Sequence, residues 1–260
     1  MATIADRRVA AVVGCAVADA AAQPLHWNYR KEKLDALLEG KEEIEFWEPS
    51  QNPFYCIPTG RHSCYGDQAQ AILESLVECK GVNVEDLTKR HYKKFGPDSD
   101  YDKSEINKYM GEEHGKVQLP IPVPWRHASI KHFLKNYETK KEETGSETDS
   151  QVDCAAKIAP VVALYAGHPE LLEKVEDVIR LTQASDVPVT IGLAAARLLE
   201  HYILHGPDPN ALEAVIKELS SPGRKNPQDL DKAVAGYLRQ VLEKREVPHY
   251  NAVAESFRKD

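Results

Sequence analysis

Residues 62–76, HSCYGDQAQAILESL, join a short polar segment directly to the pattern of an amphipathic helix. The apolar residues that recur at the spacing of one helical face are Ala69, Ile72, Leu73, Leu76 and Val77. Asp67 stands at the beginning of this pattern, where a carboxylate can cap free backbone N–H groups and interact favourably with the helix dipole. The spacing alone favours a capping aspartate on a core helix. The alternative is a metal or substrate site at the start of that helix.

The helical pattern recurs along the rest of the chain, and strand patterns are nearly absent. Residues 5–22 are small and apolar on every side, which favours a buried central helix. The prolines between 112 and 126 predict an extended loop, because proline has no backbone N–H to donate. The predicted helices cover residues 5–22, 31–38, 67–80, 83–95, 127–137, 152–166, 169–184, 187–205, 208–220 and 228–244, with a last segment at 249–258. We therefore expect one compact all-α domain over residues 1–260, without an internal repeat.

The composition excludes several classes of protein. The 260 residues carry a formal net charge of −8 and no basic stripe, so we expect no nucleic-acid partner. The five cysteines include no CxxC pair, which is typical of reduced thiols in an intracellular protein. Charged residues limit the uncharged run near the N-terminus to about ten residues, too short to span a bilayer. No signal cleavage pattern follows it, and we expect a cytoplasmic protein without a membrane partner.

His62 and Cys64 could both bind zinc, but no second pair of ligands follows at the required spacing. A calcium loop is the other local metal motif that the sequence suggests, and its details exclude it. Asp98, Asp100 and Asp102 have the spacing of the first three ligands of an EF-hand loop. The sixth position requires glycine for a sharp turn and holds Lys103, and the twelfth requires a bidentate glutamate and holds Tyr109. Local motifs alone therefore indicate only an α-helical domain.

Four stretches in order carry a resemblance to a known family. They are GCAVADAAAQPLHW (14–27), YGDQ (65–68), DCAAKIAPVVALYAG (153–167) and RLTQASDVPVTIGLAAARLLEH (180–201). The first resembles G-A-L-L-G-D-A-L-G-A-P-L-E-[FW], the second stands where T-D-D-T is found, and the last two are similar to G-A-A-M-R-I-A-P-[VI]-x-L and A-x-L-T-H. These are motifs of the ADP-ribosylglycohydrolase superfamily. The greatest similarity is to one branch of it, the selenoprotein J proteins and the J-class lens crystallins.

This resemblance implies an orthogonal all-α fold with a central cleft. Active members of the family hold two magnesium ions there, on ligands from the T-D-D-T helix start, an early acidic residue and a late D-x-D-T motif. Carboxylate oxygens are the ligands that magnesium prefers. Two such ions can orient the hydroxyls of ADP-ribose and activate water at the glycosidic carbon.

This sequence contains only part of the family's metal-binding motifs. Tyr65, Gly66 and Gln68 replace three of its residues, Asp67 remains as a vestigial metal ligand, and D-x-D-T is missing after residue 184. We expect Asp67 to serve as a helix cap and as a hydrogen-bond acceptor in the pocket. No catalytic residue is assigned. The candidates for the substrate pocket are Asp19, His26, Tyr65, Gln68, Gln151, Asp153 and Gln183, with His26 in place of the family's glutamate and Gln183 in place of its histidine.

Two functions remain open. The first is a structural role of the lens-crystallin type or a catalytically silent ADP-ribosylglycohydrolase-like protein, without a cofactor, that binds an ADP-ribose-like ligand. The alternative is a magnesium-dependent hydrolase that cleaves the glycosidic bond of ADP-ribosylated substrates. We expect no enzymatic activity, because one carboxylate cannot neutralise two divalent cations.

The chain also ends before the late family motif, so we expect the C-terminal helices of the family to be missing. Their absence would leave apolar faces of helices 187–205 and 228–244 open, which would lower stability or favour self-association. The residues of these two faces are Ile191, Leu198, Leu199 and Ile203, and Leu230, Val234, Leu238 and Val241.

Overall fold

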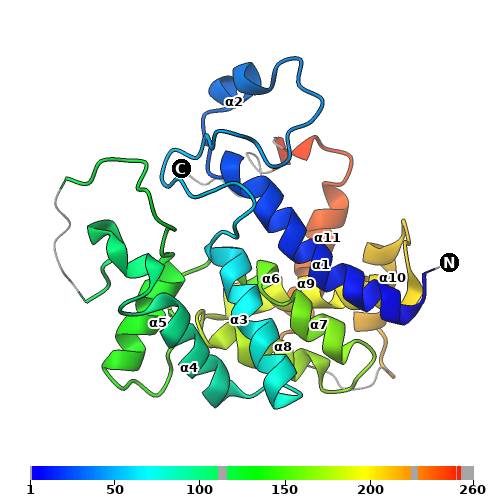
Figure 1. Cartoon of the computed structure of the whole chain (residues 1–260). Coiled ribbons are helices and arrows are strands. Elements are labelled where there is room, and N and C mark those ends of the chain that lie inside the picture. The colour runs from blue at the N-terminus through cyan, green and yellow to red at the C-terminus, as the bar shows by residue number, and fades with distance from the viewer. Residues whose placement is uncertain (1, 111–115, 224–227, 250, 253–260) are drawn as a thin grey trace.

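The structure, a computed structural model, describes residues 2–110, 116–223, 228–249 and 251–252 (Figure 1). Within these ranges the fold is all-α, as expected, with two isolated β-bridges and no strand. The helices are α1 (Ile4–Ala22), α2 (Lys31–Leu38), α3 (Cys64–Cys79), α4 (Val84–Phe95), α5 (Ala128–Glu138), α6 (Asp153–Ala156), α7 (Ala159–Tyr165), α8 (Leu171–Arg180), α9 (Asp186–His205), α10 (Ala211–Leu219) and α11 (Asp231–Glu243). Short 3₁₀ turns cover Gln23–Leu25, Asp100–Lys103 and Glu105–Asn107. Most of the segment expected at 249–258 lies outside the described residues.

The helix expected at 152–166 is in fact two helices, α6 and α7. Pro160 occupies the first turn of α7, where its missing N–H is not needed. In a continuous helix the same proline would remove a hydrogen bond and clash with the preceding turn. The break at residues 157–158 therefore follows from Pro160.

Helix α9 lies at the centre of the fold and contacts α1, α6, α7, α8, α10 and α11. Its small residues allow this close packing: a Cβ on Gly192 would lie 2.3 Å from Ile179 of α8. The fully buried residues Val175, Val178 and Val189 fill the space between α8 and α9. Helices α1, α4, α6, α7, α10 and α11 contact this pair, whereas α2 and its flanking loops extend away from the main body (Figure 1).

The prediction that the first helix is buried is wrong. Only Ala20 and Ala21 of α1 are buried, and Val9, Val13 and Val17 are exposed by 62 %, 53 % and 50 %. The apolar composition of α1 was consistent with burial, but its contacts with α3, α7 and α9 cover only one side. By length and hydropathy alone, Ile4–Leu25 and α9 could each cross a membrane, a property that buried core helices share.

The two C-terminal helical faces, part of which was expected to stay open, are covered only in part. Ile203, Val234 and Leu238 are buried, and the other residues of the two faces are partly buried. The reason is that α10 and α11 pack on each other and both pack on α9. These three helices cover much of one another's apolar sides, although Val187 and Tyr202 of α9 are exposed.

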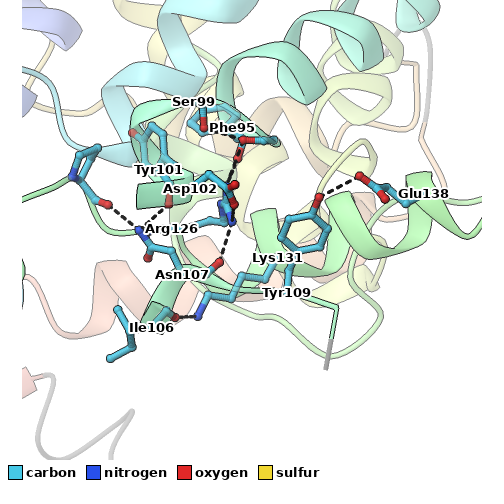
Figure 2. Close-up of polar contacts among 12 residues, drawn as sticks. Phe95, Ser99, Tyr101, Asp102, Ile106, Asn107, Tyr109, Arg126, Lys131 and Glu138 are labelled. Carbon is cyan, nitrogen blue, oxygen red and sulfur yellow. Dashed lines mark hydrogen bonds and ion pairs between the residues drawn. The ribbon is translucent and has the colours of Figure 1, made fainter. Parts of the chain in front are cut away.

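A buried arginine fastens the loop between α4 and α5 (Figure 2). The Arg126 guanidinium is fully buried and donates to the carbonyl oxygens of Asn107 at 2.7 Å and Phe95 at 2.5 Å. It also lies 5.1 Å from the centre of the Tyr109 ring. These bonds join the end of α4 to the loop, and the Asn107 amide also donates to the Tyr101 carbonyl oxygen at 2.9 Å.

Candidate functional site

The start of α3 differs from the prediction in its cap. Ser63 is the N-cap residue, and its hydroxyl accepts a hydrogen bond from the backbone N–H of Tyr65 at 3.1 Å. Asp67 lies one turn into the helix, so the prediction that Asp67 caps it is wrong. The helix begins three residues earlier than the apolar pattern showed, because serine is a strong cap and the first turn need not be apolar.

Two side chains, Tyr101 and Lys94, hold the Asp67 carboxylate on one side of α3, which we call its outer side. Its carboxylate accepts a hydrogen bond from the Tyr101 hydroxyl at 2.6 Å and lies 3.0 Å from the Lys94 ammonium. Asp67 is 6 % exposed and Tyr101 is 2 % exposed. The two residues lie at the edge of a cavity of about 330 Å³ that is also lined by cationic side chains, among them Arg61 and Lys93.

Asp19, from the last turn of α1, is used to hold the same helix start. Its carboxylate accepts from the backbone N–H of Ser63 at 2.8 Å and from the Ser63 hydroxyl at 2.5 Å. A Cβ on Gly66 would lie 2.2 Å from this carboxylate. A side chain at position 66 is therefore incompatible with Asp19 in its present position, which explains why glycine stands there.

The other candidate residues lie together on the inner side of α3. The His26 ring lies 5.4 Å from the ring of Tyr65. The Tyr65 hydroxyl donates to the Gln151 side chain at 3.5 Å, and the Gln183 amide donates to the Gln151 carbonyl oxygen at 2.8 Å. His26, Tyr65 and Gln151 reach the surface, whereas Gln183 is fully buried.

Asp153 is the buried centre of this group. It accepts hydrogen bonds from Ser129 at 2.6 Å, from Gln68 at 3.4 Å and from Gln183 at 3.5 Å. Gln183 also donates to Asp149 at 2.9 Å, and burial raises the pKa of Asp149. The structure thus brings Asp19 and the six other pocket candidates around the start of α3. It places Asp67, the expected vestigial ligand, against Tyr101 and Lys94.

His127 and Lys157 belong to the same buried group, and the sequence did not indicate either of them. The His127 ring is 2 % exposed, lies 4.1 Å from the Tyr65 ring, and has one nitrogen 4.0 Å from Asp153. Neither ring nitrogen has a hydrogen-bond partner among the described residues. Burial lowers the pKa of His127 to about 4, so the ring is neutral at pH 7. Burial also lowers the pKa of Lys157, which donates to Thr182.

The residues present do not fit a pair of magnesium ions. Asp67 faces the Lys94 ammonium, and Asp19 is occupied by Ser63. Among the described residues, no three His, Cys, Asp or Glu side chains are placed to share one metal ion. An octahedral magnesium site needs several oxygen ligands directed at one point, and these carboxylates are directed at different partners.

Comparisons with known proteins give a consistent result. The ADP-ribosylglycohydrolase family matches residues 1–258. Crystallin J1A of Tripedalia cystophora is 38 % identical over 211 residues, and crystallin J1B of the same organism is 37 % identical over 213. These alignments cover 81 % and 82 % of this chain but 62 % and 63 % of the crystallins, so the chain spans about three fifths of their length.

A solved structure has a similar fold. It is titled an ADP-ribosylglycohydrolase-related protein complex, and its TM-score to this chain is 0.57 at 18 % identity. The match covers 92 % of this chain and 76 % of the other. At this identity the similarity concerns the fold alone.

Proposed function

The chain belongs to the ADP-ribosylglycohydrolase family, and from this premise we propose that it is a catalytically silent, structural member of the J1-crystallin type. The observation that carries the proposal is the position of Asp67. In this sequence it is the one carboxylate left from T-D-D-T, and it is bound to Lys94 and Tyr101. A divalent ion at Asp67 would have to displace an ammonium group 3.0 Å away.

On the inner side of α3, Ser129, Gln68 and Gln183 all donate to Asp153. The side-chain oxygens of Gln68 and Gln183 and both ring nitrogens of His127 have no hydrogen-bond partner among the described residues, so this group keeps capacity to bind a polar ligand. The similarity to two crystallins and the acidic charge of the chain are consistent with a protein that accumulates in solution. The five unpaired cysteines fit a reducing cytoplasm.

An ADP-ribose-like ligand remains compatible with a silent protein. His26, Tyr65 and Gln151 are the candidate residues that reach the surface, so a bound ribose or pyrophosphate group would meet them first. Tyr65 and Gln151 carry a hydroxyl and an amide, which can bind sugar hydroxyls without a metal ion.

The decisive experiment measures the release of ADP-ribose from O-linked and N-linked ADP-ribosylated substrates, with excess magnesium and with EDTA. An active ADP-ribosylglycohydrolase serves as the positive control. We expect no release above the uncatalysed rate under either condition. Magnesium-dependent release that disappears in an Asp67→Asn variant would establish the hydrolase and refute the silent role.

A calorimetric titration with ADP-ribose tests the ligand separately. We expect Gln151→Ala to weaken any binding, because the Gln151 side chain bonds Tyr65 at the surface of the group. Gln70→Ala is the matched control, since Gln70 is an exposed glutamine on the outer side of α3. Equal loss in both variants would exclude the assigned pocket.

A further inference from the structure

The buried carboxylate of Asp153 has fewer close hydrogen-bond donors than its burial requires. Asp153 is 0 % exposed, and the Ser129 hydroxyl at 2.6 Å provides its one short side-chain bond among the described residues. The amides of Gln68 and Gln183 lie at 3.4 and 3.5 Å, which is longer than an ordinary hydrogen bond. A buried carboxylate is normally satisfied by several donors or by a cation, because burying an unpaired charge costs much free energy.

No cation in the described part of the chain forms an ion pair with this carboxylate at neutral pH. The one basic side chain within 4.0 Å of it is the His127 ring, which is neutral at pH 7 because burial lowers its pKa to about 4. The buried Lys157 ammonium donates to the Thr182 hydroxyl instead. Asp149 brings a second carboxylate to the group, and both burial and the charge of Asp153 raise its pKa. The group therefore favours a cation and repels an anion.

The unpartnered polar atoms around Asp153 are mostly acceptors. They are Gln68 Oε1, Gln183 Oε1 and the two ring nitrogens of His127, for which the described residues provide no hydrogen-bond partner. A neutral imidazole has one donor and one acceptor nitrogen, so the acceptors outnumber the single donor. Buried polar atoms are nearly always hydrogen-bonded, and a cluster of unpartnered acceptors indicates a place where a donor group binds. A primary ammonium group fits this set, since it has three donors, a positive charge and no acceptor.

These atoms are enclosed by the described residues themselves. Gln68, Asp153 and Gln183 are each 0 % exposed, and His127 is 2 % exposed. Their missing partners must therefore lie inside the fold, whatever covers its outer surface. The enclosure also limits the ligand to a small head group.

Two residues that contact the group also reach the surface. The Tyr65 ring lies 4.1 Å from the His127 ring, and the Gln151 carbonyl oxygen accepts from Gln183. The side chains of Tyr65 and Gln151 are joined by a hydrogen bond of 3.5 Å. Because so long a bond is weak, the two side chains can separate and let a ligand pass between them.

We propose that this enclosed group binds the head group of a small primary ammonium ion, with Asp153 as the counter-ion and the neighbouring amide and imidazole groups as acceptors. The alkyl part of the ligand extends toward the surface between Tyr65 and Gln151. The site does not rest on the silent role proposed above, because the experiments below measure binding and stability without any turnover.

A ligand-observed NMR titration with methylammonium chloride at constant ionic strength tests the site. We expect saturable binding to the wild type, and Asp153→Asn will raise the dissociation constant at least about tenfold. Tetramethylammonium has the same charge but no N–H donor, and it will not compete. Glu147→Gln is the matched control, because it removes an exposed carboxylate from the segment that precedes α6, and it will leave the dissociation constant unchanged.

Urea unfolding gives a second measurement that does not depend on the titration. Asp153→Asn removes a charge that lacks close donors, so it will leave the unfolding midpoint of the unliganded protein unchanged or raise it. Methylammonium will raise the midpoint of the wild type and not that of Asp153→Asn. Asp231→Asn will lower the midpoint, because Asp231 is a buried carboxylate that lies 3.1 Å from the Arg197 guanidinium.

Four results would overturn the proposal. The first is a wild type that shows no saturable binding of methylammonium, since water would then satisfy the unpartnered atoms. The second is tetramethylammonium that competes as well as methylammonium. The third is a loss of binding in Glu147→Gln as large as that in Asp153→Asn. The fourth is an Asp153→Asn variant that is destabilised as much as Asp231→Asn, which would make Asp153 a structural carboxylate.

Discussion

Replacing Asp67 by alanine should destabilise the unliganded protein by about 2–4 kcal/mol. The variant loses the charge-assisted hydrogen bond from Tyr101 and leaves a buried hydroxyl without a partner, which accounts for about 1.5–3 kcal/mol. It also loses the ion pair with Lys94. The Lys94 side chain is 36 % exposed, so that pair contributes less than about 1 kcal/mol.

The contacts also predict an order among three variants. Tyr101→Phe removes the hydroxyl but leaves Asp67 paired with Lys94, and should cost about 1–2 kcal/mol. Lys94→Met leaves the stronger hydrogen bond and should cost less than about 1 kcal/mol. Asp67→Ala should therefore be the most destabilising variant, followed by Tyr101→Phe and then Lys94→Met.

Urea unfolding followed by tryptophan fluorescence measures these free energies, and the chain has three tryptophans. Glu74→Ala is the control, because Glu74 lines the same cavity with a side chain that is 53 % exposed. A higher free energy of unfolding for Asp67→Ala than for the wild type would refute the reasoning. Carboxylates kept for ligand binding often destabilise the unliganded fold, so a stabilised variant would indicate a functional site.

Three further predictions follow from single contacts. Gly66→Ala should cost about 1–3 kcal/mol in urea unfolding, because Asp19 must swing away and lose its bonds to the helix cap; a neutral result would contradict the close approach. Arg126→Met should cost about 3–5 kcal/mol and lower the melting temperature, since it leaves buried carbonyl oxygens without donors. His127 has a pKa of about 4 in the fold against 6.5 ordinarily, so the unfolded chain takes up its proton first as the pH falls. Its contribution to the free energy of unfolding is therefore present above about pH 6.5 and falls by about 2 kcal/mol by pH 5. The free energy of unfolding of His127→Gln should accordingly depend less steeply on pH.

Helix positions were predictable where the end signals are local. Asn83 and Gly96 gave both ends of α4, because a cap and a terminating glycine act within one turn. The start of α3 was placed three residues late, because its first turn is polar and its cap is Ser63. The burial of α1 was not predictable, since composition states how apolar a helix is but not which neighbours cover it.

The site was predictable in part for a different reason. Gln151 and Asp153 lie two residues apart, whereas Gln183 comes from a separate segment after α8, and only the family resemblance connected the two segments before the fold was known. His127 was not found, because a histidine ahead of a helix has no distinctive spacing. The partner of Asp67 could not be predicted, because Tyr101 contacts it from a loop that lies 34 residues away in the sequence.

Cys64, the first residue of α3, gives the protein its own reporter of local opening. Its side chain is 2 % exposed, and burial raises the pKa of its thiol. Because the thiolate is the reactive form, a thiol reagent can modify Cys64 only when the helix start opens to solvent. Cys56 and Cys79 are exposed and give the rate of an unprotected thiol in the same molecule. The ratio of the two labelling rates therefore measures how often α3 separates from its neighbours, without any added probe.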